Sequence, residues 1–170
     1  MAMADLARQT DDAAKADAYL ADAQAKLDHS LELDRQYDQT YLLLAQMASS
    51  LGKPDEAQQY FEQALKWNAG SLDACAGAVD QLLQTQNYTD AEQISQAFLE
   101  KNPNSLPVLR TLARNTYYPQ NRVDEAIALC DTQKGSVANV MRSGLEKYAT
   151  VLRDGSMDKE TKINTVKQEL

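Results

Sequence analysis

The chain has 170 residues, of which 44% are hydrophobic and 6% aromatic, so its core must be built largely from Ala and Leu. Six Gly and four Pro are too few for the closely spaced turns of a β-sandwich or β-barrel. A net charge of −8 disfavours binding to nucleic acid and to anionic membrane surfaces. One His and two Cys leave little material for a zinc site or a catalytic triad, so we expect no enzyme activity, no metal and no cofactor.

Apolar residues recur at spacings of three and four along the whole chain, which predicts a series of helices. We expect them at residues 12–33, 37–51, 54–67, 72–85, 88–101, 106–117, 122–133, 137–153 and 157–169. Pro54 suits the first turn of a helix, where its missing N–H costs nothing. The expected C-terminal glycines are Gly52, Gly135 and Gly155, and the expected N-caps are Ser71, Ser105, Asn121 and Ser136.

The chain also repeats itself. Ala57, Ala91 and Ala126 occupy matching places in three similar segments, 34 and then 35 residues apart. A period of 34 indicates one helix–turn–helix unit stacked on copies of itself. The third segment carries one extra residue near Pro119. We therefore predict a single helical-repeat domain over 1–170, with a partial N-terminal repeat at 12–36, repeats at 38–71, 72–105 and 106–140, and degenerate capping helices at 141–170.

The residues that recur resemble the tetratricopeptide repeat. The first full unit matches its pattern at Tyr41, Leu44, Ala45, Gly52, Ala57, Phe61 and Ala64. The second matches at Tyr88, Ala91 and Pro103, and the third at Leu112, Ala113 and Ala126. Two positions depart from the pattern, since Cys75 replaces an aromatic residue and Gln133 a small one. The resemblance implies an all-α, right-handed superhelical solenoid of antiparallel helix pairs, whose concave groove binds an extended or helical peptide of a partner.

In this family the first helix of each pair lines the groove. The resemblance places nine partner-binding residues there: Gln39, Leu42 and Gln46 from the first full unit, Asp73, Asp80 and Leu83 from the second, and Arg110, Arg114 and Tyr117 from the third. Arg110 and Arg114 lie four apart on one helical face, where their guanidinium groups could grip a carboxylate of the partner. The alternative is that both pair with Asp73 and Asp80 and brace the stack.

One role within the family is disfavoured by particular residues. Members that bind the acidic tails of heat-shock chaperones use a clamp of Lys, Arg and Asn side chains. The matching positions here are Leu42, Gln46, Gly77, Pro107 and Thr111, and none of them carries the required charge. We therefore do not expect this co-chaperone role.

The compartment is left open by the sequence. Residues 1–5 show neither the basic nor the apolar region of a signal peptide, although the doubled Met-Ala leaves room for a removed leader. The C-terminal residues 167–170 resemble an endoplasmic-reticulum retrieval signal. By default we expect a soluble cytoplasmic protein, with Cys75 and Cys130 as buried free thiols.

These observations favour a non-enzymatic adaptor that presents a groove to a peptide or helix of another protein. Leu42 and Leu83 would make apolar contacts with this partner. Two alternatives stay open. The chain could be the accessory domain of a larger enzyme or membrane protein. It could also be an oligomerisation element in which Tyr117, Tyr118 and the end helices pack on a second copy. The sequence does not name the partner.

Overall fold

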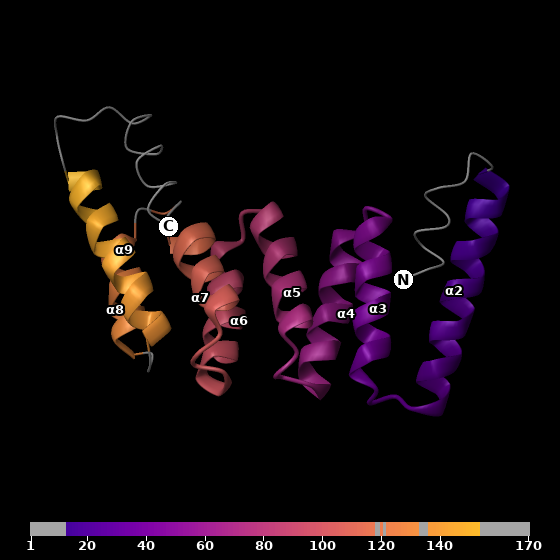
Figure 1. Cartoon of the computed structure of the whole chain (residues 1–170). Helices are drawn as coiled ribbons and strands as arrows, with labels where there is room; N and C mark the ends of the chain where they lie inside the picture. Colours follow the sequence, from indigo (N-terminus) through magenta and orange to yellow (C-terminus); the bar gives the residue numbers. More distant parts are fainter. Residues whose placement is uncertain (1–12, 118–119, 121, 133–135, 154–170) are drawn as a thin grey trace. The chain divides into compact units, whose positions relative to one another are not determined.

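The computed structural model describes residues 13–117, 120, 122–132 and 136–153 (Figure 1). These residues form helices and no β-strand, which confirms the all-α prediction. The helices are α2 (Ala13–Leu33), α3 (Asp38–Ser50), α4 (Pro54–Trp67), α5 (Leu72–Gln84), α6 (Tyr88–Lys101), α7 (Leu106–Thr111), the π-helix η1 (Leu112–Tyr117), α8 (Val123–Thr132) and α9 (Ser136–Arg153).

The chain divides into two compact units, Met1–Thr85 and Gln86–Leu170. Helices α2 to α5 belong to unit 1, and α6 to α9 with η1 belong to unit 2. How the repeats combine into a single solenoid, and its right-handed sense, stay predictions.

Every expected helix up to 137–153 has a counterpart, with ends that differ by at most one residue, and α7 with η1 together correspond to the expected helix 106–117. Pro54 begins α4 as expected, and Ser71 caps α5 by accepting a hydrogen bond from the Ala74 N–H at 3.3 Å. Ser105 precedes α7 without a side-chain cap bond. Several predicted features lie outside the described residues: helix 157–169, Gly135, Gly155, Asn121 and Pro119.

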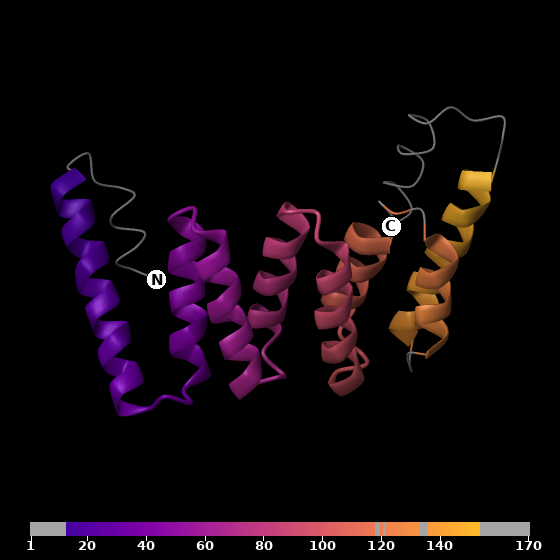
Figure 2. The same cartoon turned by 180° about the vertical axis from the view of Figure 1, so that it is seen from behind.

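Unit 1 is organised around the α3–α4 hairpin, whose two helices run antiparallel and side by side in both views (Figures 1 and 2). Helix α5 packs on α4, and α2 contacts α3. The predicted apolar stripes form the core of this unit, with Leu44, Ala45, Ala57, Phe61, Ala64, Ala74, Cys75, Ala78 and Val79 all at most 4% exposed. The many alanines allow the helices to approach closely, because they add little volume between the axes.

Both cysteines are buried and free, as predicted. Burial raises the pKa of the Cys75 thiol to about 12 and that of Cys130 to about 11, because a thiolate would lose its hydration there. Neither thiol is therefore poised as a nucleophile.

The turns that follow α3 and α5, the first helices of two repeats, share an unusual backbone conformation. Gly52 lies in the turn between α3 and α4 and has φ +70°, in the left-handed region that glycine adopts readily. Gln86 stands 34 positions later, at the same place in the next repeat, and has φ +58°. A side chain with a Cβ is strained in this conformation.

We expect Gln86→Gly to raise the free energy of unfolding by about 1 kcal/mol, because glycine relieves the strain at this backbone angle. Gln84→Gly is the matched control, since Gln84 has helical geometry at the end of α5 and should lose stability. Urea unfolding followed by far-UV circular dichroism measures both. Equal losses in the two variants would contradict the strain at Gln86.

Unit 2 departs from regular α-helix in the third repeat. The expected helix 106–117 continues from α7 into the π-helix η1, in which each N–H bonds the carbonyl five residues earlier. The Arg122 N–H likewise bonds the Tyr117 carbonyl, five positions back, at 3.0 Å. These wider turns hold one residue more than an α-helical turn would. The α8 stripe reaches the core at Ala126 and Cys130.

Candidate functional site

The first candidate surface lies in unit 1, where α3 and α5 are in contact. The Gln81 side chain on α5 donates a hydrogen bond to Ser49 Oγ on α3 at 3.0 Å, which holds the two helices together along this side. We call this surface the α3–α5 face and define it by four predicted residues that are all exposed, Gln39, Gln46, Asp73 and Asp80. The two helices that carry the first two sets of predicted groove residues are therefore in direct contact.

The two predicted leucines differ in their surroundings. Leu42 is 6% exposed and contributes to the core of unit 1. Leu83 is half-buried, so part of its side chain remains available for an apolar contact. Asp80 has a raised pKa, because neighbouring atoms remove part of the water around its carboxylate. A cationic group brought close to Asp80 would restore that lost stabilisation of charge.

The third predicted set belongs to unit 2. Arg110 is exposed on α7 and forms no ion pair with any residue that the structure describes. Arg114 lies in η1, and its side chain is outside the described part. Tyr117 is 2% exposed, so its ring lies inside unit 2.

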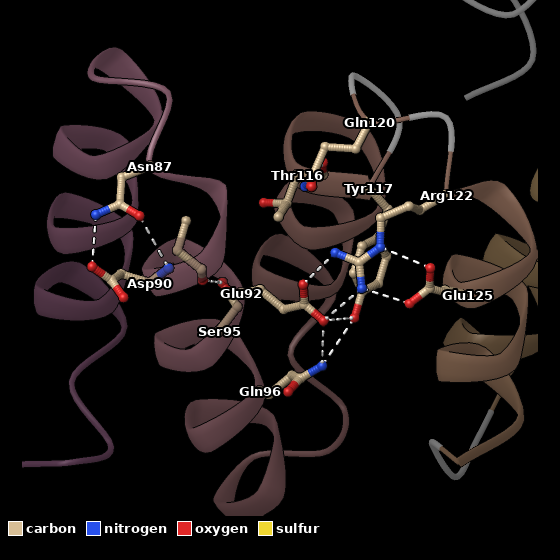
Figure 3. Close-up of polar contacts among 11 residues, drawn as sticks. Asn87, Asp90, Glu92, Ser95, Gln96, Thr116, Tyr117, Gln120, Arg122 and Glu125 are labelled. Carbon is tan, nitrogen blue, oxygen red and sulfur yellow. Dashed lines mark hydrogen bonds and ion pairs between the residues drawn. The ribbon is translucent and has the colours of Figure 1, made fainter.

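Tyr117 is part of a polar cluster that we call the Glu92 cluster, formed by Glu92, Gln96, Tyr117, Arg122 and Glu125 (Figure 3). The Tyr117 hydroxyl donates to Glu92 Oε1 at 2.8 Å and accepts from Gln96 Nε2 at 2.9 Å. The Arg122 guanidinium donates to both oxygens of Glu92, at 2.6 and 3.2 Å. It also lies over the Tyr117 ring, 4.7 Å from the centroid.

The same guanidinium bridges two carboxylates. Its Nε and Nη2 atoms donate to Glu125 at 2.7 and 2.5 Å, while Nη1 donates to Glu92 (Figure 3). These bonds raise the pKa of Arg122 and lower the pKa of Glu125, because the ion pair favours both charged forms. Charge-assisted, forked bonds of this kind fix orientation as well as distance. The cluster therefore ties α6, η1 and α8 together within unit 2.

Burial, together with the hydrogen bond to Glu92, raises the pKa of Tyr117 to about 12. The folded state thus holds this proton more tightly than the unfolded chain does. The resulting stabilisation is complete below pH 10 and is lost as the pH rises through about 12.

We expect Tyr117→Phe to lower the free energy of unfolding by about 1 kcal/mol at pH 7, the contribution typical of such hydrogen bonds. The difference in free energy of unfolding between the two proteins should shrink between pH 10 and pH 12, because the phenol of the unfolded chain ionises before that of the folded chain. Urea unfolding at a series of pH values measures it. Tyr88→Phe is the control, since Tyr88 lies at the start of α6, outside the Glu92 cluster. A difference that stays constant up to pH 12 would contradict the raised pKa.

Sequence reasoning missed Glu92, Gln96, Arg122 and Glu125. Two signals pointed to them. Arg122 and Glu125 are three apart at the start of a predicted helix, a spacing that favours an ion pair. Glu92 occupies the repeat position of Gln58, 34 residues earlier, so a carboxylate replaces an amide there.

A cavity of about 460 Å³ lies beside the Glu92 cluster in unit 2. Its lining residues are Glu92, Gln96, Leu99 and Glu100 from α6, Tyr117 from η1, and Glu125, Ala128 and Leu129 from α8. Across the described residues, no three His, Cys, Asp or Glu are grouped so that they could hold a metal ion. None of the helices that the structure describes is long and apolar enough to cross a membrane.

The comparison with known families agrees with the repeat pattern. Residues 48–115 match the model of the tetratricopeptide repeat family, a segment that runs from the end of α3 into η1. No curated protein matches the chain. Residues 48–115 therefore carry the tetratricopeptide repeat, as the resemblance of the sequence implied.

Proposed function

We propose that the chain is a non-enzymatic adaptor whose α3–α5 face binds a peptide segment of a partner protein. Tetratricopeptide repeats are typically protein-interaction modules without catalytic activity, which supports the general role. The observation that carries the specific proposal is the exposure of Gln39, Gln46, Asp73 and Asp80 on two helices held together by the Gln81–Ser49 hydrogen bond.

The chemistry of this face suits a backbone in an extended conformation. The amides of Gln39 and Gln46 each offer donors and an acceptor, which is what unpaired N–H and C=O groups of a peptide require. Asp73 and Asp80 accept hydrogen bonds from N–H groups or from a cationic side chain. Asp80 is stabilised most by such a contact, because its carboxylate is already partly dehydrated. Leu83 supplies the apolar contact in this proposal, because Leu42 is buried within unit 1.

In unit 2 we propose that Arg110 binds an acidic group of the partner, with Arg114 four residues further along the chain. Arg110 is exposed and forms no ion pair among the residues described, so its guanidinium is available for a bidentate contact with a carboxylate. The bracing of the stack by pairs with Asp73 and Asp80 is the competing prediction.

The experiment places a photo-crosslinking amino acid at position 46 of the full chain, in lysate of its source. Mass spectrometry then identifies the partner segment that is joined to it, and a synthetic peptide of that segment is used for calorimetric titration. We expect Asp73→Lys/Asp80→Lys to weaken binding of this peptide by tenfold or more. Asp28→Lys/Glu32→Lys changes the net charge equally on α2 and should leave the affinity unchanged.

Equal losses in both double variants would mean that net charge alone drives binding, which would contradict a specific face. Arg110→Glu tests the acidic contact separately and should weaken only peptides that contain Asp, Glu or a free C-terminus. Self-crosslinking from position 46, with a mass in sedimentation that rises with concentration, would instead favour the oligomerisation element. A reading frame that extends into a catalytic or membrane-spanning region would favour the accessory-domain alternative.

A further inference from the structure

The cavity beside the Glu92 cluster has an apolar side and a charged side. Leu99, which is 1% exposed, contributes the apolar side together with Ala128 and Leu129 of α8. These residues follow Gln96 and Glu125 by about one helical turn, so the apolar surface continues directly from the polar cluster. A ligand that fits both sides needs an aliphatic stretch and a polar end.

The charge of the lining is one-sided. Three carboxylates line the cavity, those of Glu92, Glu100 and Glu125, and the lining residues that the structure describes include no basic side chain. Arg122 neutralises part of this charge, but its single guanidinium is shared between Glu92 and Glu125. Glu100 has no ion pair or hydrogen bond to another side chain in the described part of the chain. The cavity therefore keeps a negative charge next to an apolar surface.

The polar wall is also already organised. Both oxygens of Glu92 accept bonds from Arg122, and Tyr117 and Gln96 complete its hydrogen bonding. Because these side chains are held by one another, a ligand would not have to order them on binding, which lowers the entropic cost of association. Glu100 lies at the other end of the α6 lining, and its carboxylate can pair with a positive charge on the ligand.

We propose that this cavity binds the side chain of a Lys or Arg in a segment of a partner protein. The aliphatic stem lies against Leu99, Ala128 and Leu129, and the cationic head pairs with the carboxylates of Glu100 and Glu125. Long basic side chains combine an apolar stem with a charged end, so they match both sides of the cavity. The site lies wholly in unit 2 and does not depend on the α3–α5 face, so either proposal can fail alone.

The test titrates the ¹⁵N-labelled full chain with three blocked tripeptides, Gly-Lys-Gly, Gly-Arg-Gly and Gly-norleucine-Gly, and with butylammonium. We expect the amide signals of Leu99, Glu100, Ala128 and Leu129 to shift and saturate with the Lys and Arg peptides. Norleucine has nearly the same shape without the charge, and it should bind about fivefold more weakly or not at all.

Two variants separate the charge from the shape of the cavity. Glu100→Gln should weaken the Lys peptide about fivefold without disturbing the Glu92 cluster, whereas Glu62→Gln on α4 removes the same charge elsewhere and should have no effect. Ala128→Phe fills the cavity at an exposed position and should abolish the saturable shifts with the charge unchanged.

Each other outcome overturns the proposal. Equal binding of the norleucine peptide would make the site merely apolar. Butylammonium binding as tightly as the Lys peptide would assign the cavity to small amines. Shifts that spread over the acidic surface and do not saturate would show only general attraction to the charge of −8. Saturable binding that survives both Glu100→Gln and Ala128→Phe would place the site elsewhere.

Discussion

Replacing Arg122 with Met is expected to lower the free energy of unfolding by about 2–3 kcal/mol. The Glu92 carboxylate is only 17% exposed, and the change leaves it without the cation that compensates its charge. Breaking one side of such a pair costs more than the pair itself contributes, because the remaining charge cannot recover its hydration. Methionine keeps the length of the stem, so lost packing adds little.

Two further variants identify the cause of that loss. Glu92→Gln combined with Arg122→Met removes the uncompensated charge, and it should regain at least half of the lost stability. Arg122→Lys keeps the charge but not the fork to Glu92 and Glu125, so it should fall between wild type and Arg122→Met. Urea unfolding followed by far-UV circular dichroism measures all of them. A loss below about 0.5 kcal/mol in Arg122→Met would show that the cluster acts only as a surface ion pair.

Gly77→Ala is expected to lower the free energy of unfolding by about 1–2 kcal/mol, although alanine is the better helix former. Gly77 lies inside α5, and a Cβ added there would overlap ring carbons of Phe61 on α4. Phe61 is 4% exposed and tightly packed, so its ring cannot move aside freely. Overpacking typically costs 1–3 kcal/mol, which exceeds the gain of about 1 kcal/mol in helix propensity.

The neighbouring position supplies a calibration. Ala76→Gly, on the exposed side of α5, changes helix propensity alone and should cost about 1 kcal/mol. Phe61→Leu makes room for the methyl group of Gly77→Ala. The double variant should therefore lose less free energy of unfolding than the sum of the losses in the two single variants. Urea unfolding followed by Trp67 fluorescence reports on unit 1 directly. A stabilised Gly77→Ala would contradict the close packing of α5 on α4.

Much of the fold was predictable because helices and repeats produce regular spacings of apolar residues along the sequence. The three- and four-residue spacing of apolar residues predicted the helices, and Gly52 was expected at the C-terminus of the helix that ends there. The π-helix η1 was not predicted, although the sequence shows that the third repeat carries an extra residue. Periodicity shows that a residue is inserted, but the hydrogen bonds that take it up depend on what packs against the helix.

The candidate sites divide in the same way. The family resemblance placed Gln39, Gln46, Asp73 and Asp80 on the groove side of their helices, and all four are exposed. The family resemblance also placed Tyr117 in the groove, yet its hydroxyl bonds Glu92, 25 residues away in the chain. One helical face can meet either solvent or a neighbouring helix, and spacing along the chain does not distinguish the two.

Sequence alone thus established the helices, their order, the repeat and the family resemblance, because each rests on residues within a few turns or one period of one another. Tertiary structure was needed for the Glu92 cluster, for the cavity beside it and for the division between buried Leu42 and exposed Gln46. Those features arise where side chains from α6, η1 and α8, or from α3 and α5, come within hydrogen-bonding or van der Waals distance. Such contacts depend on packing between helices, which no single stretch of the chain encodes.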